Sequence, residues 1–207
     1  MIETFLNMDP VTIATFLMAG IVLNLTPGAD VVFATASGIS GGWRFGVAAA
    51  FGIALGAVVH ITLAAVGISA ALMALPWAYD AIRYLGAAYL LYLAVKSWRA
   101  PPETGNTQGA KGARQAIRRG FLTNLMNPKV ALFVLAFLPQ FTALEAGPVW
   151  HQILILGGLF TVTVFFITAA YGAAAGIAGT ALRGASGLMN KISAIVFGGL
   201  AAKLVMD

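Results

Sequence analysis

The sequence predicts an all-α polytopic membrane protein with six transmembrane helices, arranged as two inverted three-helix repeats. The first observation is composition: 60% of the 207 residues are hydrophobic and 9% are charged, whereas about 25% are charged in a soluble domain. The second is that the apolar residues form six long runs. The third is that a proline-containing polar turn interrupts the first and fourth runs, so helices 1 and 4 are expected to break at Pro27 and Pro128.

Each apolar run has about the 20 residues that a helix needs to cross the hydrocarbon core of a bilayer. The runs lie at roughly 10–38, 45–74, 78–98, 115–141, 150–176 and 187–206. Because they leave little length for a soluble domain, we expect one transmembrane domain over residues 1–207. In an alternative five-span arrangement, part of the first or fourth run lies in the membrane interface.

A stretch rich in Pro, Gly and polar residues, at about 99–113, divides the chain into repeat A at about 10–98 and repeat B at about 114–206. We interpret this stretch as a cytoplasmic linker. Because each half has three spans, the second half enters the membrane from the opposite side to the first. This is the arrangement of the inverted-topology repeats found in many secondary transporters.

The basic residues predict the orientation, because Lys and Arg favour cytoplasmic loops. With the N-terminus outside, the residues on the cytoplasmic side are Arg44, Lys96, Arg99, Lys111, Arg114, Arg118, Arg119, Arg183 and Lys191. Arg83 and Lys203 then fall outside, and Lys129 lies within a span. We therefore expect a multi-pass membrane protein with both termini on the external side. The first residues lack the basic region of a cleaved signal peptide, so we expect the first run to be retained.

Charge and cysteine content exclude several other classes. The net charge of +5 comes from basic residues between apolar runs rather than on one solvated face, so we expect no nucleic-acid partner. The chain has no cysteine, which excludes disulfides and thiolate metal sites, and we expect no metal and no cofactor. The sequence also lacks a phosphate-binding Gly-x-x-x-x-Gly-Lys motif, so energy for transport would come from a gradient or a partner.

The two interrupting turns, residues 24–30 and 123–129, can be superposed on their prolines. At an offset of 101 residues they pair Thr26 with Asn127, Pro27 with Pro128, and Gly28 with Lys129. Thr and Asn are good N-caps and Pro is favoured at the first helical position, so each turn predicts a new half-helix that begins inside a span. Two such helix N-termini can converge on one midplane cavity and offer backbone N–H groups to a carboxylate.

Asp30 and Lys129 are, apart from His60, the ionisable residues that we place well inside the hydrocarbon. A charge there costs several kcal/mol, so each needs a partner or water. In the functional interpretation, Asp30 takes a substrate ammonium or a coupling proton and Lys129 takes a substrate carboxylate. Three asparagines would satisfy the opened backbone: Asn24, Asn124 and Asn127. In the structural interpretation, the two charges form an ion pair and the asparagines only repair proline kinks.

His60 follows Gly52 and Gly56 at spacings of four residues, on a small-residue stripe that allows two helices to approach closely. Its imidazole could relay a proton. The plainer interpretation is a neutral histidine that bonds to a neighbouring backbone carbonyl. A glycine stripe of this kind could also serve a homodimer.

Three motifs carry a resemblance to a known family. They are Leu25-Thr26-Pro27-Gly28-Ala29-Asp30, the segment 84–93 with Leu85-Gly86-Ala87-Ala88-Tyr89-Leu90, and Asn124-Leu125-Met126-Asn127-Pro128-Lys129 followed by Leu138-Pro139-Gln140-Phe141. By their order and spacing, the chain resembles the LysE/RhtB family of bacterial amino acid exporters from about residue 10 to its end. One departure is Ala29, where the family often has proline.

The resemblance implies a transporter rather than an enzyme, with an amino acid or a close derivative as substrate. Export would be driven by the membrane potential or by proton antiport. Two other kinds of function remain as alternatives: a structural or assembly membrane protein without transport, and an exporter of another small metabolite. An intramembrane serine hydrolase is disfavoured, because Ser37-Gly38 lacks the preceding Gly-x and the last spans contain no histidine base.

Overall fold

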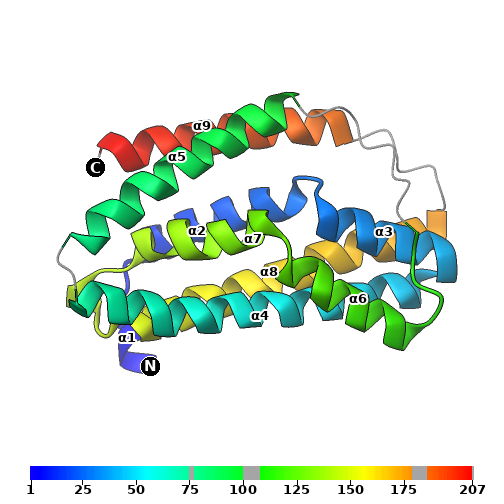
Figure 1. Cartoon of the computed structure of the whole chain (residues 1–207), viewed down its shortest axis with the longest axis horizontal. Helices are drawn as coiled ribbons and strands as arrows, with labels where there is room; N and C mark the ends of the chain where they lie inside the picture. Colours follow the sequence, from blue (N-terminus) through cyan, green and yellow to red (C-terminus); the bar gives the residue numbers. More distant parts are fainter. Residues whose placement is uncertain (75–76, 100–107, 179–185, 207) are drawn as a thin grey trace.

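The computed structural model describes residues 1–74, 77–99, 108–178 and 186–206, with side chains except at 68–74, 78–80, 82–83, 186–189, 193 and 203–205. Every regular element in these ranges is helical (Figure 1). Arg83, Arg183 and Lys203 lie outside the described side chains. The side of the membrane on which each basic residue lies remains a prediction.

The first half of the chain contains α1 (Ile2–Asn7), α2 (Pro10–Leu25), α3 (Ala29–Gly41), α4 (Trp43–Ala74) and α5 (Ala78–Arg99). The second half contains α6 (Ala113–Leu125), α7 (Pro128–Leu132), the π-helix η1 (Phe133–Phe137), the 3-10 helices η2 (Leu138–Phe141) and η3 (Leu144–Ala146), α8 (Val149–Ala178) and α9 (Ser186–Met206). The helices coincide closely with the six predicted runs.

Within the described residues, two helices are long and apolar enough to cross a membrane, at Trp43–Gly67 and Val149–Ala178. Two further candidates are bent pairs. The pair α2 and α3 bends by 53°, and the pair formed by α6 and the segment Pro128–Phe141 bends by 51°. The two predicted breaks are therefore present, with up to four candidate spans. That α5 and α9 also cross, and that the halves are inverted repeats, remain predictions.

Helix α4 lies at the centre of the packing and contacts α3, α6 and α8. Its contact with α6 depends on glycine: a Cβ at Gly52 would overlap the backbone carbonyl of Ile117, and one at Gly120 would overlap that of Ala49. Close approach of the two backbones therefore excludes any side chain there. The stripe through Gly52 and Gly56 packs within the chain, so it is not the surface of a homodimer.

A cluster of phenylalanine rings fills the space between α2, α8 and the segment after α7. Ring centroids lie 4.9 Å apart for Phe133 and Phe137, 5.1 Å for Phe133 and Phe160, and 5.4 Å for Phe16 and Phe141. Three of these side chains belong to the irregular helical segment η1 and η2. The rings thus pack the C-terminal half of the fourth predicted span against the first and fifth.

Helices α5 and α9 lie side by side along one face of the bundle (Figure 1). The backbone of α5 approaches η1 closely, because a Cβ at Gly86 would lie 2.5 Å from the carbonyl oxygen of Ala136. This contact brings α5 close to the segment that follows the second break.

Asp9 caps the N-terminus of α2. Its carboxylate accepts bonds from the Thr12 hydroxyl and from the backbone N–H groups of Thr12 and Val11, and these bonds lower the pKa of the carboxyl.

Candidate functional site

The first break differs from its prediction. Helix α2 ends at Leu25 with Thr26 as its C-cap, Pro27 lies between the helices, and Gly28 is the N-cap of α3. The prediction of Thr26 as an N-cap is therefore wrong. The hydroxyl of Thr26 instead donates to the carbonyl of Val22 at 2.6 Å, because a threonine in a helix can bond to its own preceding turn. The proline also holds Thr26 in an extended conformation, with ψ 120.

The second break follows its prediction. Asn127 is the N-cap of α7, and its Oδ1 accepts a hydrogen bond from the backbone N–H of Lys129 at 3.0 Å. Pro128 occupies the first helical position, where its missing N–H has no consequence. The two breaks therefore share a proline and a bend but differ in capping: the N-cap side chain of α7 accepts from its helix, whereas the N-cap of α3 is a glycine.

The two breaks meet at Asp30, which lies in the first turn of α3 and is 8% exposed. Its Oδ2 accepts hydrogen bonds from Nδ2 of Asn124 at 2.8 Å and from Nδ2 of Asn127 at 3.0 Å. The two asparagines flank the proline break of the other half. A carboxylate from repeat A is thus held by both ends of the break in repeat B, at a place shielded from solvent.

Lys129 reaches back to the first break. Its Nζ donates to the backbone carbonyl of Thr26 at 2.8 Å. The side chain passes over Gly28, where a Cβ would lie 3.4 Å from Nζ. The cation of repeat B therefore lies at the C-terminal end of α2, where the helix dipole favours positive charge.

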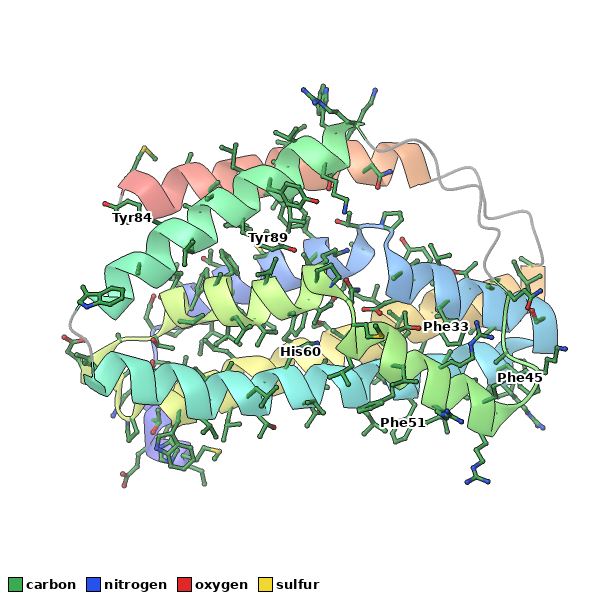
Figure 2. All side chains as sticks on the ribbon, in the orientation of Figure 1. Phe33, Phe45, Phe51, His60, Tyr84 and Tyr89 are labelled. Carbon is green, nitrogen blue, oxygen red and sulfur yellow. The ribbon has the colours of Figure 1, made fainter. Side chains whose placement is uncertain are left out.

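His60 completes the second break from α4. Its Nε2 donates to the carbonyl of Asn124 at 3.2 Å, and the side chain is 7% exposed. Pro128 follows this carbonyl at the position that would donate to it in a continuous helix and has no N–H. Figure 2 shows His60 where α4 passes this break. The interpretation of His60 as a donor to a neighbouring carbonyl is confirmed, while a proton relay remains untested.

Asn24 makes a contact between helices that the sequence did not predict. Its Nδ2 donates to Oγ1 of Thr163 on α8 at 3.0 Å, and that hydroxyl donates to the carbonyl of Phe160 at 2.7 Å. The side chain thus ties the end of α2 to α8. Its predicted role at the opened backbone stays a prediction.

Two tyrosines that were not among the predicted site residues bond to the backbone at the breaks. The hydroxyl of Tyr171 on α8 donates to the carbonyl of Leu25 at 3.2 Å, and that of Tyr89 on α5 donates to the carbonyl of Lys129 at 3.2 Å. Tyr89 lies on the side of α5 that faces α7 (Figure 2). Tyr89 belongs to the segment 84–93, one of the three motifs that carry the family resemblance. That motif was the signal in the sequence that could have identified Tyr89 as a candidate.

A small cavity lies between the breaks, with a volume of ≈ 10 Å³ for the centre of a water-sized sphere. It is lined by Leu23, Asn24, Thr26, Gly28, Asp30, Val31, Asn127, Lys129, Val130, Val164 and Thr168. This space is about the minimum for one water molecule. An amino acid therefore requires a rearrangement of the cavity walls before it can bind there.

Two acceptors at the junction of the breaks are buried without a hydrogen-bond partner. They are Oδ1 of Asp30 and Oδ1 of Asn124. An unpaired buried acceptor is costly, and more so when it carries charge. The carboxyl of Asp30 therefore has one oxygen that could take a proton, while its other oxygen is already held by amide donors.

Broken helices that meet at a buried charge are typical of membrane transporters. The profile of the family described as LysE type translocator matches residues 21–207. The chain therefore belongs to the LysE type translocator family, which is a family of membrane transporters. No solved structure matches the chain significantly.

Curated relatives are similar over most of their length. An uncharacterized membrane protein of Vibrio cholerae is 34% identical over 151 residues, which are 72% of this chain and 73% of the relative. A homoserine/homoserine lactone efflux protein of Salmonella typhimurium is 31% identical over 144 residues, and a leucine efflux protein of Enterobacter sp. is 32% identical over 145 residues. Each of these two alignments covers 69% of both chains. The family resemblance carried by the three motifs is confirmed.

Proposed function

We propose that this chain is a secondary active exporter of amino acids or close derivatives, with its substrate site between the two broken helices near the membrane midplane. The family and the efflux proteins among its relatives support the class of function. The observation that carries the proposal for the site is the contact of Asp30 with Asn124 and Asn127 beside a water-sized cavity. It places one ionisable group where both halves of the chain meet.

Asp30 is the proposed coupling group. A proton on its Oδ1 would neutralise the buried carboxyl, and release of that proton would restore a negative charge to which the amides of Asn124 and Asn127 donate. The cost of a buried charge thus links the protonation of Asp30 to the opening of the site. Proton antiport is the coupling that this arrangement supports best.

Alternating access would move one three-helix repeat against the other around this junction. The proposal includes six spans, a location in the bacterial inner membrane and both termini in the periplasm. The glycine contacts of α4 with α6 join helices of different repeats, so this interface is the one that a relative movement of the repeats must change.

Export is tested in cells that express the chain and are loaded with a panel of dipeptides, whose hydrolysis raises internal amino acid concentrations. Extracellular amino acids are profiled over time for the native chain, Asp30→Asn and the control Asp9→Asn, at matched membrane levels. Asp9 lies outside the site, and asparagine is also a good helix cap. Accumulation of particular amino acids with the native chain and the control, but not with Asp30→Asn, supports the proposal.

A profile identical to that of cells without the chain, with folded protein verified in the membrane, would contradict amino acid export. It would favour the alternative of another small metabolite or of a structural role. The unfolding temperature helps to separate another metabolite from a structural role. If Asp30 has a purely structural role, Asp30→Asn lowers the unfolding temperature and the native chain transports nothing.

A further inference from the structure

We propose that Lys129 is a tethered substitute for the ammonium group of the substrate. Its Nζ holds the carbonyl of Thr26, and a zwitterionic substrate displaces it: the ammonium of the substrate takes that carbonyl, and the released Lys129 pairs with the carboxylate. This inference rests on the proposed function and names the chemical class that the site selects.

The first support is the position of the Thr26 carbonyl at the end of α2. Two other carbonyls of this turn have partners from the protein: that of Val22 accepts from Thr26, and that of Leu25 accepts from the hydroxyl of Tyr171. The carbonyl of Thr26 accepts from Nζ of Lys129 at 2.8 Å. It lies beside the cavity and at the negative end of a helix dipole, which is a favourable place for any ammonium group.

The second support is the path of the lysine side chain over Gly28. A Cβ at Gly28 would lie 3.4 Å from Nζ and 3.8 Å from Cδ of Lys129. The aminobutyl chain therefore lies along the first break, within van der Waals range of Gly28. The contact between Lys129 and Thr26 joins the two halves of the chain.

The third support is the size of the cavity. Its ≈ 10 Å³ accommodates about one water molecule, and Lys129 forms part of its wall. The aminobutyl chain is about as large as glycine. Withdrawal of this chain from the Thr26 carbonyl would therefore enlarge the cavity and uncover the group that binds ammonium in the same movement.

Charge balance identifies the substrate class. A zwitterion brings one positive and one negative charge, so displacement of Lys129 leaves every charge with a partner. An N-acetylated amino acid has no ammonium to take the carbonyl of Thr26, and an amino acid methyl ester leaves Lys129 without a carboxylate. We expect the free ammonium to be essential for displacement and the free carboxylate to strengthen it, because an unpaired buried charge is costly.

The test uses the absence of cysteine from the chain. A Val164→Cys reporter places one thiol on the cavity wall at a buried position, and its reaction rate with N-ethylmaleimide measures how often the cavity opens. The rate is compared in purified protein carrying Lys129, Lys129→Met or Lys129→Arg. Lys96→Met is the matched control, since Lys96 lies beside the ring of Tyr92, away from the breaks.

We expect Lys129→Met to raise the labelling rate by about tenfold or more, the effect of losing one buried bond to a charged group. n-Butylammonium should lower the labelling rate of the Lys129→Met protein towards the native rate, whereas butanol should leave it unchanged. Lys129→Arg, which keeps the cation, and Lys96→Met should label at nearly the native rate. A native labelling rate in folded Lys129→Met protein, or equal slowing by butanol, would overturn the inference.

Leucine and homoserine should increase labelling of the native reporter, their methyl esters less so, and N-acetyl-leucine not at all. An increase with N-acetyl-leucine equal to that with leucine would overturn the requirement for an ammonium group. The amine effect does not depend on transport. Rescue by butylammonium without efflux of any amino acid from cells would therefore support the tether and contradict the proposed function.

Discussion

Asn124 and Asp30 are joined across the two breaks, with Nδ2 of Asn124 lying 2.8 Å from Oδ2 of Asp30. The residues are 94 positions apart in the sequence, and each lies within one turn of a helix break. The same asparagine offers its backbone carbonyl to His60. The side chain and main chain of one residue thus connect α3, α4 and α6.

Asn124→Ala should reduce both stability and export. It removes one of the two amide donors to Oδ2 of Asp30, and the loss of a buried bond to a charged group should cost about 1–3 kcal/mol. Asn127→Ala should destabilise more, because it removes a donor to Asp30 together with the cap of α7. Thermal unfolding of purified protein and efflux from cells measure the two effects. An Asn124→Ala protein as stable and active as the native chain would remove this bond from the account.

His60→Gln should keep most of the export activity, because its amide can still donate to the carbonyl of Asn124. His60→Leu should destabilise the protein by about 0.5–1.5 kcal/mol, since it removes one of two donors to a buried carbonyl, which keeps its bond from the backbone N–H of Asn127. Efflux and unfolding temperature are measured for both variants. Complete loss of export by a stable His60→Gln protein would instead favour a proton relay through the imidazole.

Gly52→Ala should separate α4 from α6, because the new methyl group would overlap the carbonyl of Ile117. We expect a loss of about 1–3 kcal/mol, the usual effect of overpacking. Gly158→Ala is the matched control, since a Cβ there meets nothing within 4 Å. Unfolding temperatures that fall equally in both variants would show that the close approach is unimportant.

Topology can be measured with single cysteines, again because the native chain has none. Leu144→Cys, at a position 80% exposed, should react with a membrane-impermeant maleimide from the periplasmic side. Gln108→Cys, at an exposed position near the predicted linker, should react only after the inner membrane is opened. Labelling of both positions from the same side would contradict the inverted arrangement of the halves.

The bounds of the helices could be predicted from the sequence because long apolar runs separated by charged turns have few alternative structures. The predicted run 45–74 corresponds to Trp43–Ala74, and the run 115–141 to residues between Ala113 and Phe141. The breaks were predictable because a proline cannot donate to its preceding turn.

The chemistry of the first break was harder to predict. Thr26 can cap the helix that follows or bond to the helix that precedes, and only the folded chain shows that it does the latter. The π-helix Phe133–Phe137 has the same apolar composition as an α-helix, so nothing in its sequence distinguishes it. The contacts of Tyr89 and Tyr171 depend on tertiary packing and are invisible to local patterns.

The most direct test of the central claim is proton-coupled transport by Asp30→Asn in proteoliposomes. Native protein, Asp30→Asn and Asp9→Asn are reconstituted at equal density, and uptake of a labelled substrate is measured with and without a pH gradient, alongside exchange of substrate at equilibrium. We expect the gradient to drive accumulation by the native and Asp9→Asn proteins, and Asp30→Asn to lose this accumulation. Undiminished gradient-driven accumulation by Asp30→Asn would contradict the role of the carboxylate held between the two breaks.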